Sequence, residues 1–385
     1  MTCSELPNVP NLTLAAQTSR CQFSRRLARL GFAVALVIAV PVLAQPPLKD
    51  HSASFTLEND LFFRTDKYYT NGVQLTVSER LDSRFDITKT ILEKACGLAG
   101  CGTDSAEFLG AHTRVGQLMY TPVNIRDPLP QPLDRPWAGL LYYAADYQFG
   151  SKDERVLTTI TGQVGVIGPG SLAEQTQTWI HKATKNDLPR GWGNQIGGEL
   201  GLLASIEKRY AIGEVAKTES NEKPVEIRTT GYWRIAAGNI MTFAGAGLGV
   251  AIGKDLPTVV PRESGGIGVK SMWRNRVKEQ SLSSANSSCL FRWLRCFAFA
   301  DAEVRLVAWN VFLDGAMFHD GPKVSKQPLV AEVSLGFRLD FPESRNSVTG
   351  PWFVQFKATR RSPEFTSIDP VPFQTFGALT LGTEF

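Results

Sequence analysis

The sequence lacks the excess of one charge that is typical of nucleic-acid-binding proteins. Its 385 residues include 41 Lys and Arg against 37 Asp and Glu, which gives a formal net charge of +4. Four Arg and one acid, Glu5, fall within residues 1–44, so the net charge of the remaining chain is only +1. We therefore expect no nucleic acid among the partners of the protein.

Long hydrophobic runs are absent after residue 44. No later segment reaches the roughly 18 uninterrupted apolar residues that a membrane-spanning helix needs, which excludes a helical membrane protein. The apolar run from Leu30 to Leu43 follows a region with four Arg, at positions 20, 25, 26 and 29, and leads to Ala44. This order of basic, apolar and small residues predicts an export signal over residues 1–44. Residues 45–385 then form one mature domain.

Residues that build the common metal and nucleophile sites are scarce. Of six Cys, Cys3 and Cys21 lie in the signal, and the others form two close pairs, Cys96/Cys101 and Cys289/Cys296. Neither pair has a neighbouring His or a second CxxC unit, which argues against a zinc site. The pairs either form disulfides, as export permits, or stay reduced. A serine elbow, a Gly-rich phosphate loop and an HExxH motif are all missing.

What the sequence does contain is a repeated alternation of apolar and polar residues. In segment 329–341 the odd positions are all apolar, whereas positions 332 to 340 carry Glu, Ser, Gly, Arg and Asp in between. Such alternation predicts strands with one apolar and one polar face. A soluble sandwich alternates in the same way, but the final segment ends in Phe385, as many outer-membrane barrels do. We therefore predict an all-β, antiparallel transmembrane β-barrel.

Twelve segments share this pattern, an even number that closure by antiparallel hairpins requires. The predicted strands are 52–63, 68–80, 107–121, 137–149, 154–167, 195–209, 224–238, 240–252, 295–309, 329–341, 350–361 and 373–385. If the mature N-terminus is periplasmic, the odd-to-even connections lie outside the cell. One of them contains segment 171–186, in which apolar residues recur with helical spacing and Ser171 can cap the helix. We expect this segment to be a short helix in an extracellular loop.

Several polar residues gather on the predicted extracellular side. Strict alternation places Asn59 on the lipid face, where an amide without a partner costs about 1–3 kcal/mol. Either the strand ends at the polar rim, or a bulge intervenes, or protein covers this side chain. A single His is more often structural than catalytic, but parity brings His181 to the same side. The full set is Asn59, Asp60, Thr70, Arg126, His181 and Asp187. Amide and carboxylate oxygens suit calcium, and a neutral imidazole can deprotonate water.

These residues belong to a combination of short motifs that resembles the outer-membrane lipid A 3'-O-deacylase family (LpxR-type). The motifs are Glu58-Asn59-Asp60, Tyr69-Thr70-Asn71-Gly72, Gly165-Val166-Ile167-Gly168-Pro169 with His181 twelve residues later, Asn310-Val311-Phe312-Leu313-Asp314-Gly315, and Arg361-Ser362-Pro363-Glu364-Phe365. The resemblance extends over about residues 54–385, nearly the whole mature chain.

The resemblance implies a twelve-stranded barrel whose site lies between the wall and a helix of an outer loop. There a calcium ion would polarise an ester carbonyl while a His activates water. By motif, the catalytic residues would be Asn59, Asp60, Thr70 and His181, the calcium ligands Asn59, Asp60 and Asp187, and the substrate-binding residue Arg126. Asp187 stands where the family also carries Glu, and Arg126 is the nearest basic residue to the family's loop Lys. The implied partner is lipid A, or lipopolysaccharide, in the outer leaflet of the outer membrane, with no obligate protein partner.

Two other functions remain open from the sequence. A passive porin would need an open lumen, whereas the predicted inward residues Glu58, Asp60, Glu332, Arg338 and Asp340 could pair and fill it. A phospholipase-type barrel would need a serine nucleophile within reach of His181. For lipid phosphates, Arg135 is a second candidate partner beside Arg126.

Overall fold

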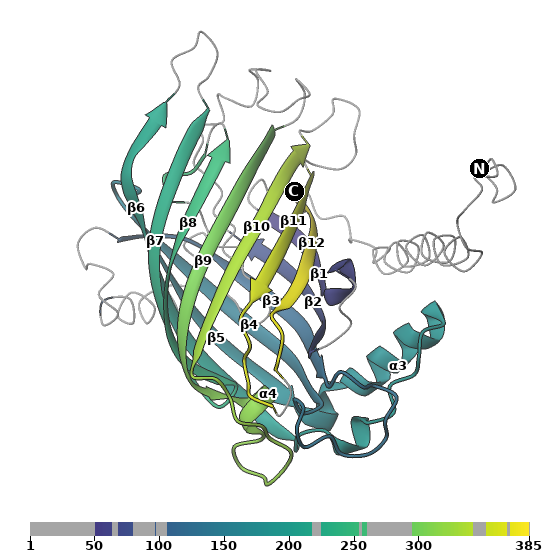
Figure 1. The fold of residues 1–385 in the computed structure, drawn as a ribbon. Helices are drawn as coiled ribbons and strands as arrows, with labels where there is room; N and C mark the ends of the chain where they lie inside the picture. The colour runs from purple at the N-terminus through teal and green to yellow at the C-terminus, as the bar shows by residue number, and fades with distance from the viewer. Residues whose placement is uncertain are drawn as a thin grey trace, which may run out of the picture.

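A computed structural model describes residues 51–63, 68–79, 97, 106–217, 225–253, 256–259, 295–341, 352–367 and 370–384. Over these residues the chain forms a closed barrel of twelve antiparallel strands, in which consecutive strands pair and β1 closes the ring against β12 (Figure 1). The predicted fold class is confirmed. The export signal over 1–44 and the pair Cys96/Cys101 lie outside the described residues.

The strand boundaries agree closely with the alternation in the sequence. The strands are β1 His51–Asn59, β2 Tyr68–Glu79, β3 Ala106–Thr121, β4 Ala138–Ser151, β5 Val156–Ile167, β6 Glu199–Lys217, β7 Glu226–Ala237, β8 Met241–Gly253, β9 Arg295–Asn310, β10 Leu329–Phe341, β11 Trp352–Arg361 and β12 Gln374–Glu384. The first strand is shorter than predicted, because Asp60–Phe63 forms the 3-10 helix η1. Strand β6 is longer and continues to Lys217.

The two faces of the wall have the predicted chemistry. In β10, Leu329, Val333 and Leu335 are exposed on the outer face, whereas Glu332 and Ser334 are buried in the interior. Apolar side chains on the outside suit a barrel that is surrounded by hydrocarbon. Among the described residues, no helix is both long enough and apolar enough to span a bilayer.

Ion pairs fill the interior. Glu332 accepts hydrogen bonds from Arg305 and Arg361, each at 2.8 Å, and Arg114 donates to Asp146 at 2.6 Å. All five side chains are buried. Buried charges are tolerated when each is paired and hydrogen-bonded. The paired groups occupy the space that a diffusing solute would need.

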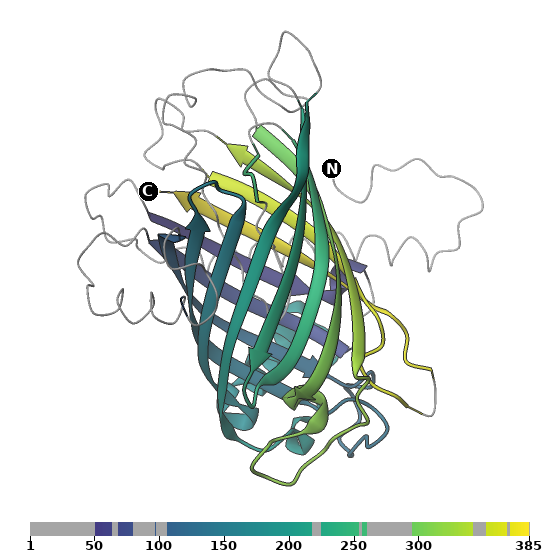
Figure 2. The ribbon, with the colours of Figure 1, turned by 90° about the vertical axis from the view of Figure 1, so that its left-hand side faces the viewer.

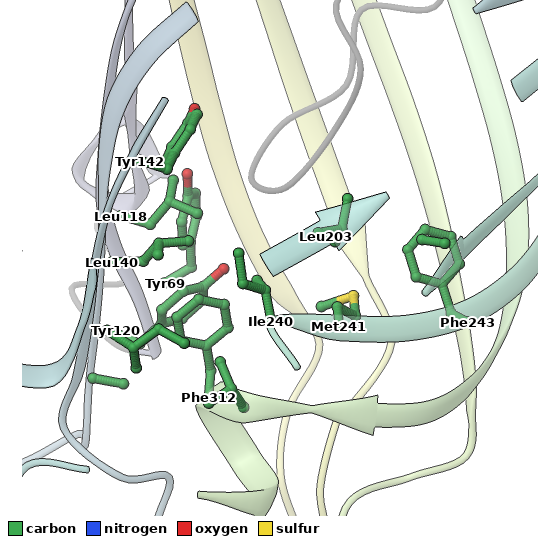
Figure 3. Packing of buried hydrophobic residues seen from close by; sticks show 14 of the residues in the cluster. Tyr69, Leu118, Tyr120, Leu140, Tyr142, Leu203, Ile240, Met241, Phe243 and Phe312 are labelled. Carbon is green, nitrogen blue, oxygen red and sulfur yellow. The ribbon is translucent and has the colours of Figure 1, made fainter. Parts of the chain in front are cut away.

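An apolar cluster gathers inside the barrel near the end that carries helix α4, Val311–Asp314 (Figure 3). The helix brings Phe312 against Tyr120 of β3, with 4.3 Å between ring centroids. The helix begins at this point because the side chain of Asn310 accepts a hydrogen bond from the Phe312 N–H at 3.1 Å. The same end carries α3 (Ala173–Thr184), outside the wall, in the β5–β6 connection (Figures 1 and 2). We call it the α3 end.

Of the two states left open for the pair Cys289/Cys296, the structure shows the oxidised one for Cys296. Cys296, the second residue of β9, is disulfide-bonded. The other member of the predicted pair, Cys289, lies outside the described residues. An oxidised cysteine fits a protein that is exported from the reducing cytoplasm.

Candidate functional site

A sharp turn after β5 returns the chain to the outer face of the barrel. Gly168 has a φ of 75°, a conformation that residues with a side chain rarely adopt, and it begins the 3-10 helix η2 (Gly168–Ser171). The Ser171 carbonyl accepts a hydrogen bond of 2.6 Å from Gln117 of β3. Gly139 of β4 permits a close approach, since a Cβ there would lie 2.5 Å from the Cβ of Ala173. The start of α3 is therefore docked on β3 and β4.

The helix α3 buries two polar side chains against the protein, whereas Glu174, Gln175 and Lys182 are exposed. It begins at Ala173 rather than at residue 171, because Ser171 ends η2 and donates its hydroxyl to the Gly168 carbonyl at 2.6 Å. Gln177 and His181 lie on the buried face, whereas Trp179 is 61% exposed.

Two tryptophans support the segment that follows α3. Trp192, at the start of η3 (Trp192–Asn194), packs on Trp137 with 5.0 Å between ring centroids. Both belong to a buried cluster with Met119 of β3. The Trp192 indole N–H donates a hydrogen bond of 2.7 Å to Oε1 of Gln177. The buried face of α3 is thus connected to a rigid aromatic support.

The ring of His181 is fixed by the backbone that follows the helix. Its Nδ1 lies 2.5 Å from the carbonyl oxygen of Asp187. A carbonyl only accepts hydrogen bonds, so Nδ1 carries a proton, and Nε2 is the ring nitrogen that can present a lone pair. The Asp187 carboxylate forms an ion pair with Arg126, and both side chains are exposed, at 58% and 70%. The structure therefore brings together three of the predicted site residues.

A second group of polar residues lies on the outer face of the wall. Asn59 is the partner of Asn71 in the β1–β2 pairing and of Gly377 in the β1–β12 pairing. Phe62 of η1 lies against Gly377, because a Cβ there would be only 2.9 Å from its ring. Asn71 is buried, and its Oδ1 has no hydrogen-bond partner in the described part of the chain. Two amides thus occupy positions where alternation predicts apolar side chains.

A β-bulge explains why Tyr69 points inwards although Asn71, two residues later, faces outwards. The β2–β3 register shifts between Tyr69 and Asn71, so Thr70 is the extra residue. Tyr69 points inwards and donates its hydroxyl proton to the carboxylate of Glu58. The side chain of Thr70 is outside the part that the structure describes. Of the three explanations offered for Asn59, the end of the strand is the one observed, because β1 ends at this residue. The bulge lies in β2 and not in β1.

The predicted metal ligands are distributed over both groups. Asp60 is buried at the start of η1, beside Asn59, whereas Asp187 belongs to the His181 group. In the described ranges, no three His, Cys, Asp or Glu side chains are grouped so that they could hold a metal ion. Amide oxygens such as those of Asn59 and Asn71 are not among those residue types.

Arg135 is not at the surface, which corrects its place as a candidate for lipid phosphates. It is fully buried, its guanidinium lies 4.4 Å from the centre of the Tyr120 ring, and Nη1 is 3.7 Å from Glu364. Burial lowers the pKa of Arg135. For Glu364, burial acts to raise the pKa of the carboxyl group. The positive charges of Arg361 and Arg135 outweigh burial and hold this pKa below its ordinary value. Arg135 therefore connects its loop to the barrel interior.

Sequence reasoning missed two buried side chains of this region. Asn71 lies within a quoted motif and has the parity of the outward-facing Val73, but its burial is not visible in the sequence. Gln177 stands four residues before His181, the spacing that places two residues on one helix face. That spacing was the available signal in the sequence. It indicates a shared site only when it is known that this face of α3 is the buried one.

Comparison with known proteins gives one family. Residues 30–385 match the model of the family described as outer membrane protein LpxR. The structure of LpxR from Salmonella typhimurium has a TM-score of 0.63 at 17% identity, covering 87% of this chain and 100% of that one.

Two other solved barrels resemble the chain less well. The β domain of the Bordetella autotransporter BrkA has a TM-score of 0.36 at 7% identity, covering 87% of this chain and 98% of that one. An outer-membrane channel from Pseudomonas putida has a TM-score of 0.36 at 8% identity, with 89% and 97% covered. A comparison with curated proteins gives no match. The chain is an outer-membrane β-barrel that belongs to the LpxR family.

Proposed function

We propose that the protein is an esterase that removes an ester-linked acyl chain from lipid A, at the 3'-O position, with water as the nucleophile. The observation that carries this proposal is the fixed ring of His181, whose Nδ1 is committed to the Asp187 carbonyl. Membership of the LpxR family and the motif resemblance to lipid A deacylases support the substrate class. The outward-facing amides of Asn59 and Asn71 support a site that lipid reaches from the side.

His181 acts as the general base in this proposal. Its Nε2 takes a proton from water, and the water oxygen forms a bond to the ester carbon while the carbonyl electron pair moves to oxygen. When the bond between the acyl carbon and the sugar oxygen breaks, the imidazolium returns the proton to the leaving sugar alkoxide. The products are a free fatty acid and a sugar hydroxyl. The Asp187 carbonyl stabilises the imidazolium by keeping its hydrogen bond to Nδ1.

The wall residues fit a hard cation, and we propose calcium. Asn59 and Asn71 offer amide oxygens from opposed positions, and the carboxylate of Asp60 follows directly in the chain. Oxygen-only ligand sets of this kind suit calcium. Bound there, calcium would supply Lewis-acid polarisation of the ester carbonyl. Asp187 is the further proposed calcium ligand, and Thr70 is a further proposed catalytic residue. The other polar groups of the site would orient the lipid.

Arg126 is the proposed contact for a phosphate of the lipid. Its ion pair with Asp187 is exposed, and exposed pairs contribute only about 0–1 kcal/mol. A guanidinium binds phosphate through two parallel hydrogen bonds, which are stronger. Exchange of the Asp187 carboxylate for a lipid phosphate is therefore favourable, and it leaves the Asp187 carbonyl on His181 undisturbed.

The other two functions gain no support. The ion pairs of the interior and the apolar cluster at the α3 end oppose a passive porin. For a serine nucleophile, a hydroxyl should bind the imidazole, but within the described ranges the hydrogen bond of the His181 ring goes to a carbonyl. The nearby Ser171 hydroxyl is committed to Gly168.

Mass spectrometry of lipid A tests the proposal directly. Cells that express the wild-type protein should contain lipid A that is lighter by one ester-linked acyl chain, with the matching fatty acid released. Cells that express His181→Ala at equal barrel yield should contain unmodified lipid A. Unmodified lipid A in wild-type cells, with the barrel assembled and calcium present, would contradict the assignment.

A further inference from the structure

We propose that a cavity in the β9–β10 connection binds a sugar unit of lipopolysaccharide. The cavity lies in a different loop from His181, and no residue of its wall is among the predicted site residues. This inference rests on the proposed esterase function, because it extends the contact with the lipid to the saccharide part of the same molecule. Three observations carry it: the size and place of the cavity, its rigid frame, and the mixed chemistry of its wall.

The cavity has the volume of a small-molecule site. It measures about 520 Å³ and is lined by Trp309 and by residues of the segment 314–323. Ligand cavities in proteins are typically about 300–1,000 Å³. The loop lies at the α3 end of the barrel, the end that is predicted to be extracellular (Figures 1 and 2). It also contacts the connection that carries α3, since a Cβ at Gly197 would be 3.1 Å from the Cβ of His319. The cavity is therefore a neighbour of the loop that carries the proposed site.

Hydrogen bonds hold the wall of the cavity in place. The Phe318 N–H donates to the buried carboxylate of Glu199 on β6 at 3.0 Å. The Asp314 carboxylate accepts from Lys326 at 2.9 Å and from the Asn310 N–H at 2.8 Å. A loop that is already ordered loses little conformational entropy when it binds a ligand. The cavity is therefore preorganised for binding.

The wall combines donors, acceptors and an aromatic ring. Asp320 can accept hydrogen bonds, Lys323 can donate them, and His319 can do either. These three side chains are exposed, and within the described ranges none of them has a hydrogen bond or an ion pair. Phe318 lies beside them and is 71% exposed. A sugar hydroxyl both donates and accepts, and the C–H groups of a sugar ring suit the negative face of an aromatic ring. The wall thus matches both surfaces that a sugar presents.

Other ligands fit this wall less well. In the part of the chain that the structure describes, no three His, Cys, Asp or Glu side chains are grouped so that they could hold a metal ion. A phosphate would meet the carboxylates of Asp314 and Asp320, which repel it. An acyl chain would remove water from the charged side chains without replacing their hydrogen bonds. A neutral, polyhydroxylated ligand avoids all three difficulties.

Lipopolysaccharide presents such a ligand at the α3 end. Its acyl chains stay in the bilayer, whereas its sugars extend away from the membrane. A lipid held at the wall beside α3 would therefore direct its saccharide toward the loops of the same end, among which is the β9–β10 connection. This neighbourhood favours lipopolysaccharide over a free saccharide as the source of the sugar.

Calorimetric titration tests the cavity without any enzymatic step. The probe is the lipid-free oligosaccharide that mild acid releases from lipopolysaccharide, added to the purified barrel in detergent. Wild type should bind it saturably, and Phe318→Ala and Asp320→Ala should each weaken binding by about 10-fold, as expected for the loss of one central contact. The matched control is Phe373→Ala, which removes an exposed ring from the β11–β12 connection and should bind like wild type.

Kinetics on two substrates identify the source of the sugar. With complete lipopolysaccharide, the two cavity variants should raise KM by about 10-fold and leave kcat nearly unchanged, because the sugar contact is the same in the ground state and the transition state. With free lipid A, which lacks the outer sugars, both constants should equal those of Phe373→Ala. Unfolding temperatures should equal that of wild type, since the substituted side chains are exposed.

The remaining outcomes overturn different parts of the reasoning. Absence of oligosaccharide binding, or binding that needs neither Phe318 nor Asp320, overturns the proposal. Binding that needs them, with KM on lipopolysaccharide unchanged, places a free saccharide in the cavity and overturns the assignment to the substrate. If wild type hydrolyses neither lipid but binds the oligosaccharide through these residues, the esterase function fails and the sugar site stands.

Discussion

A single methyl group on Gly139 should separate the position of α3 from the stability of the barrel. In Gly139→Ala, the new Cβ would lie 2.5 Å from the Cβ of Ala173, whereas ordinary contact begins at 3.4 Å. The backbone of Ala173 must therefore retreat by about 0.9 Å, because a methyl group cannot rotate out of the way. Overpacking of this kind costs about 1–3 kcal/mol. We expect this cost to destabilise the docked position of α3 rather than the hydrogen bonds between the strands. A displacement of about 1 Å at a reacting group can reduce a rate by about 10²-fold.

The control for this prediction is Gly162→Ala on β5. A Cβ at Gly162 meets nothing within 4 Å, so the same change in propensity occurs without a clash. We expect lipid A deacylation by Gly139→Ala to fall by about 10²-fold, while Gly162→Ala stays near wild type and both barrels show wild-type heat-modifiable mobility on gels. Equal activity of the two variants would refute the reasoning, because it would mean that the docking of α3 on β4 does not position the chemistry.

Three further predictions concern the base, the cation and the interior. His181→Asn should lower the deacylation rate by about 10²- to 10⁴-fold without a change in unfolding temperature, since the amide cannot take a proton from water; near-wild-type turnover would exclude His181 as the base. Calcium should raise the unfolding temperature of the purified barrel in a concentration-dependent way, and a chelator should abolish turnover; Asn71→Leu should weaken both effects. The folded-state pKa of Glu364 is lowered, so its carboxylate stabilises the native state at neutral pH, and this contribution is lost as pH falls below the ordinary Glu value of about 4.3. Glu364→Gln should accordingly lower the unfolding temperature at pH 7 and flatten its decline between pH 5 and about pH 3; an unchanged profile would contradict this.

The strands were predictable because lipid and paired charges impose opposite chemistry on alternate residues. Segment 329–341 shows this directly, and β10 has those boundaries. The end of β1 was not predictable in the same way. Leu61 and Phe63 continue the alternation in the sequence, yet the backbone turns into η1 after Asn59. A local pattern cannot show where tertiary contacts, such as that of Phe62 with Gly377, end a strand.

The sequence supplied candidate residues for the site, which stay predictions, but it did not show their contacts. The motifs and the positions near them indicated Asn59, His181 and Asp187. However, the His181 ring donates its hydrogen bond to the backbone carbonyl of Asp187, and a sequence pattern does not show backbone contacts. The spacing of Trp179 and Ile180 indicated a helix, but it did not show that the buried face of this helix carries Gln177 and His181. Some motif residues have a structural role, since Asn310 caps the N-terminus of α4.

If the proposed site is correct, the outward direction of Asn59 and Asn71 sets how the enzyme meets its substrate. A site inside the lumen would sample molecules from solution, whereas a site on the outer wall samples neighbours by lateral diffusion within one leaflet. The concentration that governs turnover is then a mole fraction among lipids rather than a molarity. Dilution with inert lipid or detergent at constant volume should slow the enzyme, and dilution with buffer should not. Packing and charge of the surrounding leaflet thereby become regulators of the protein without any allosteric site.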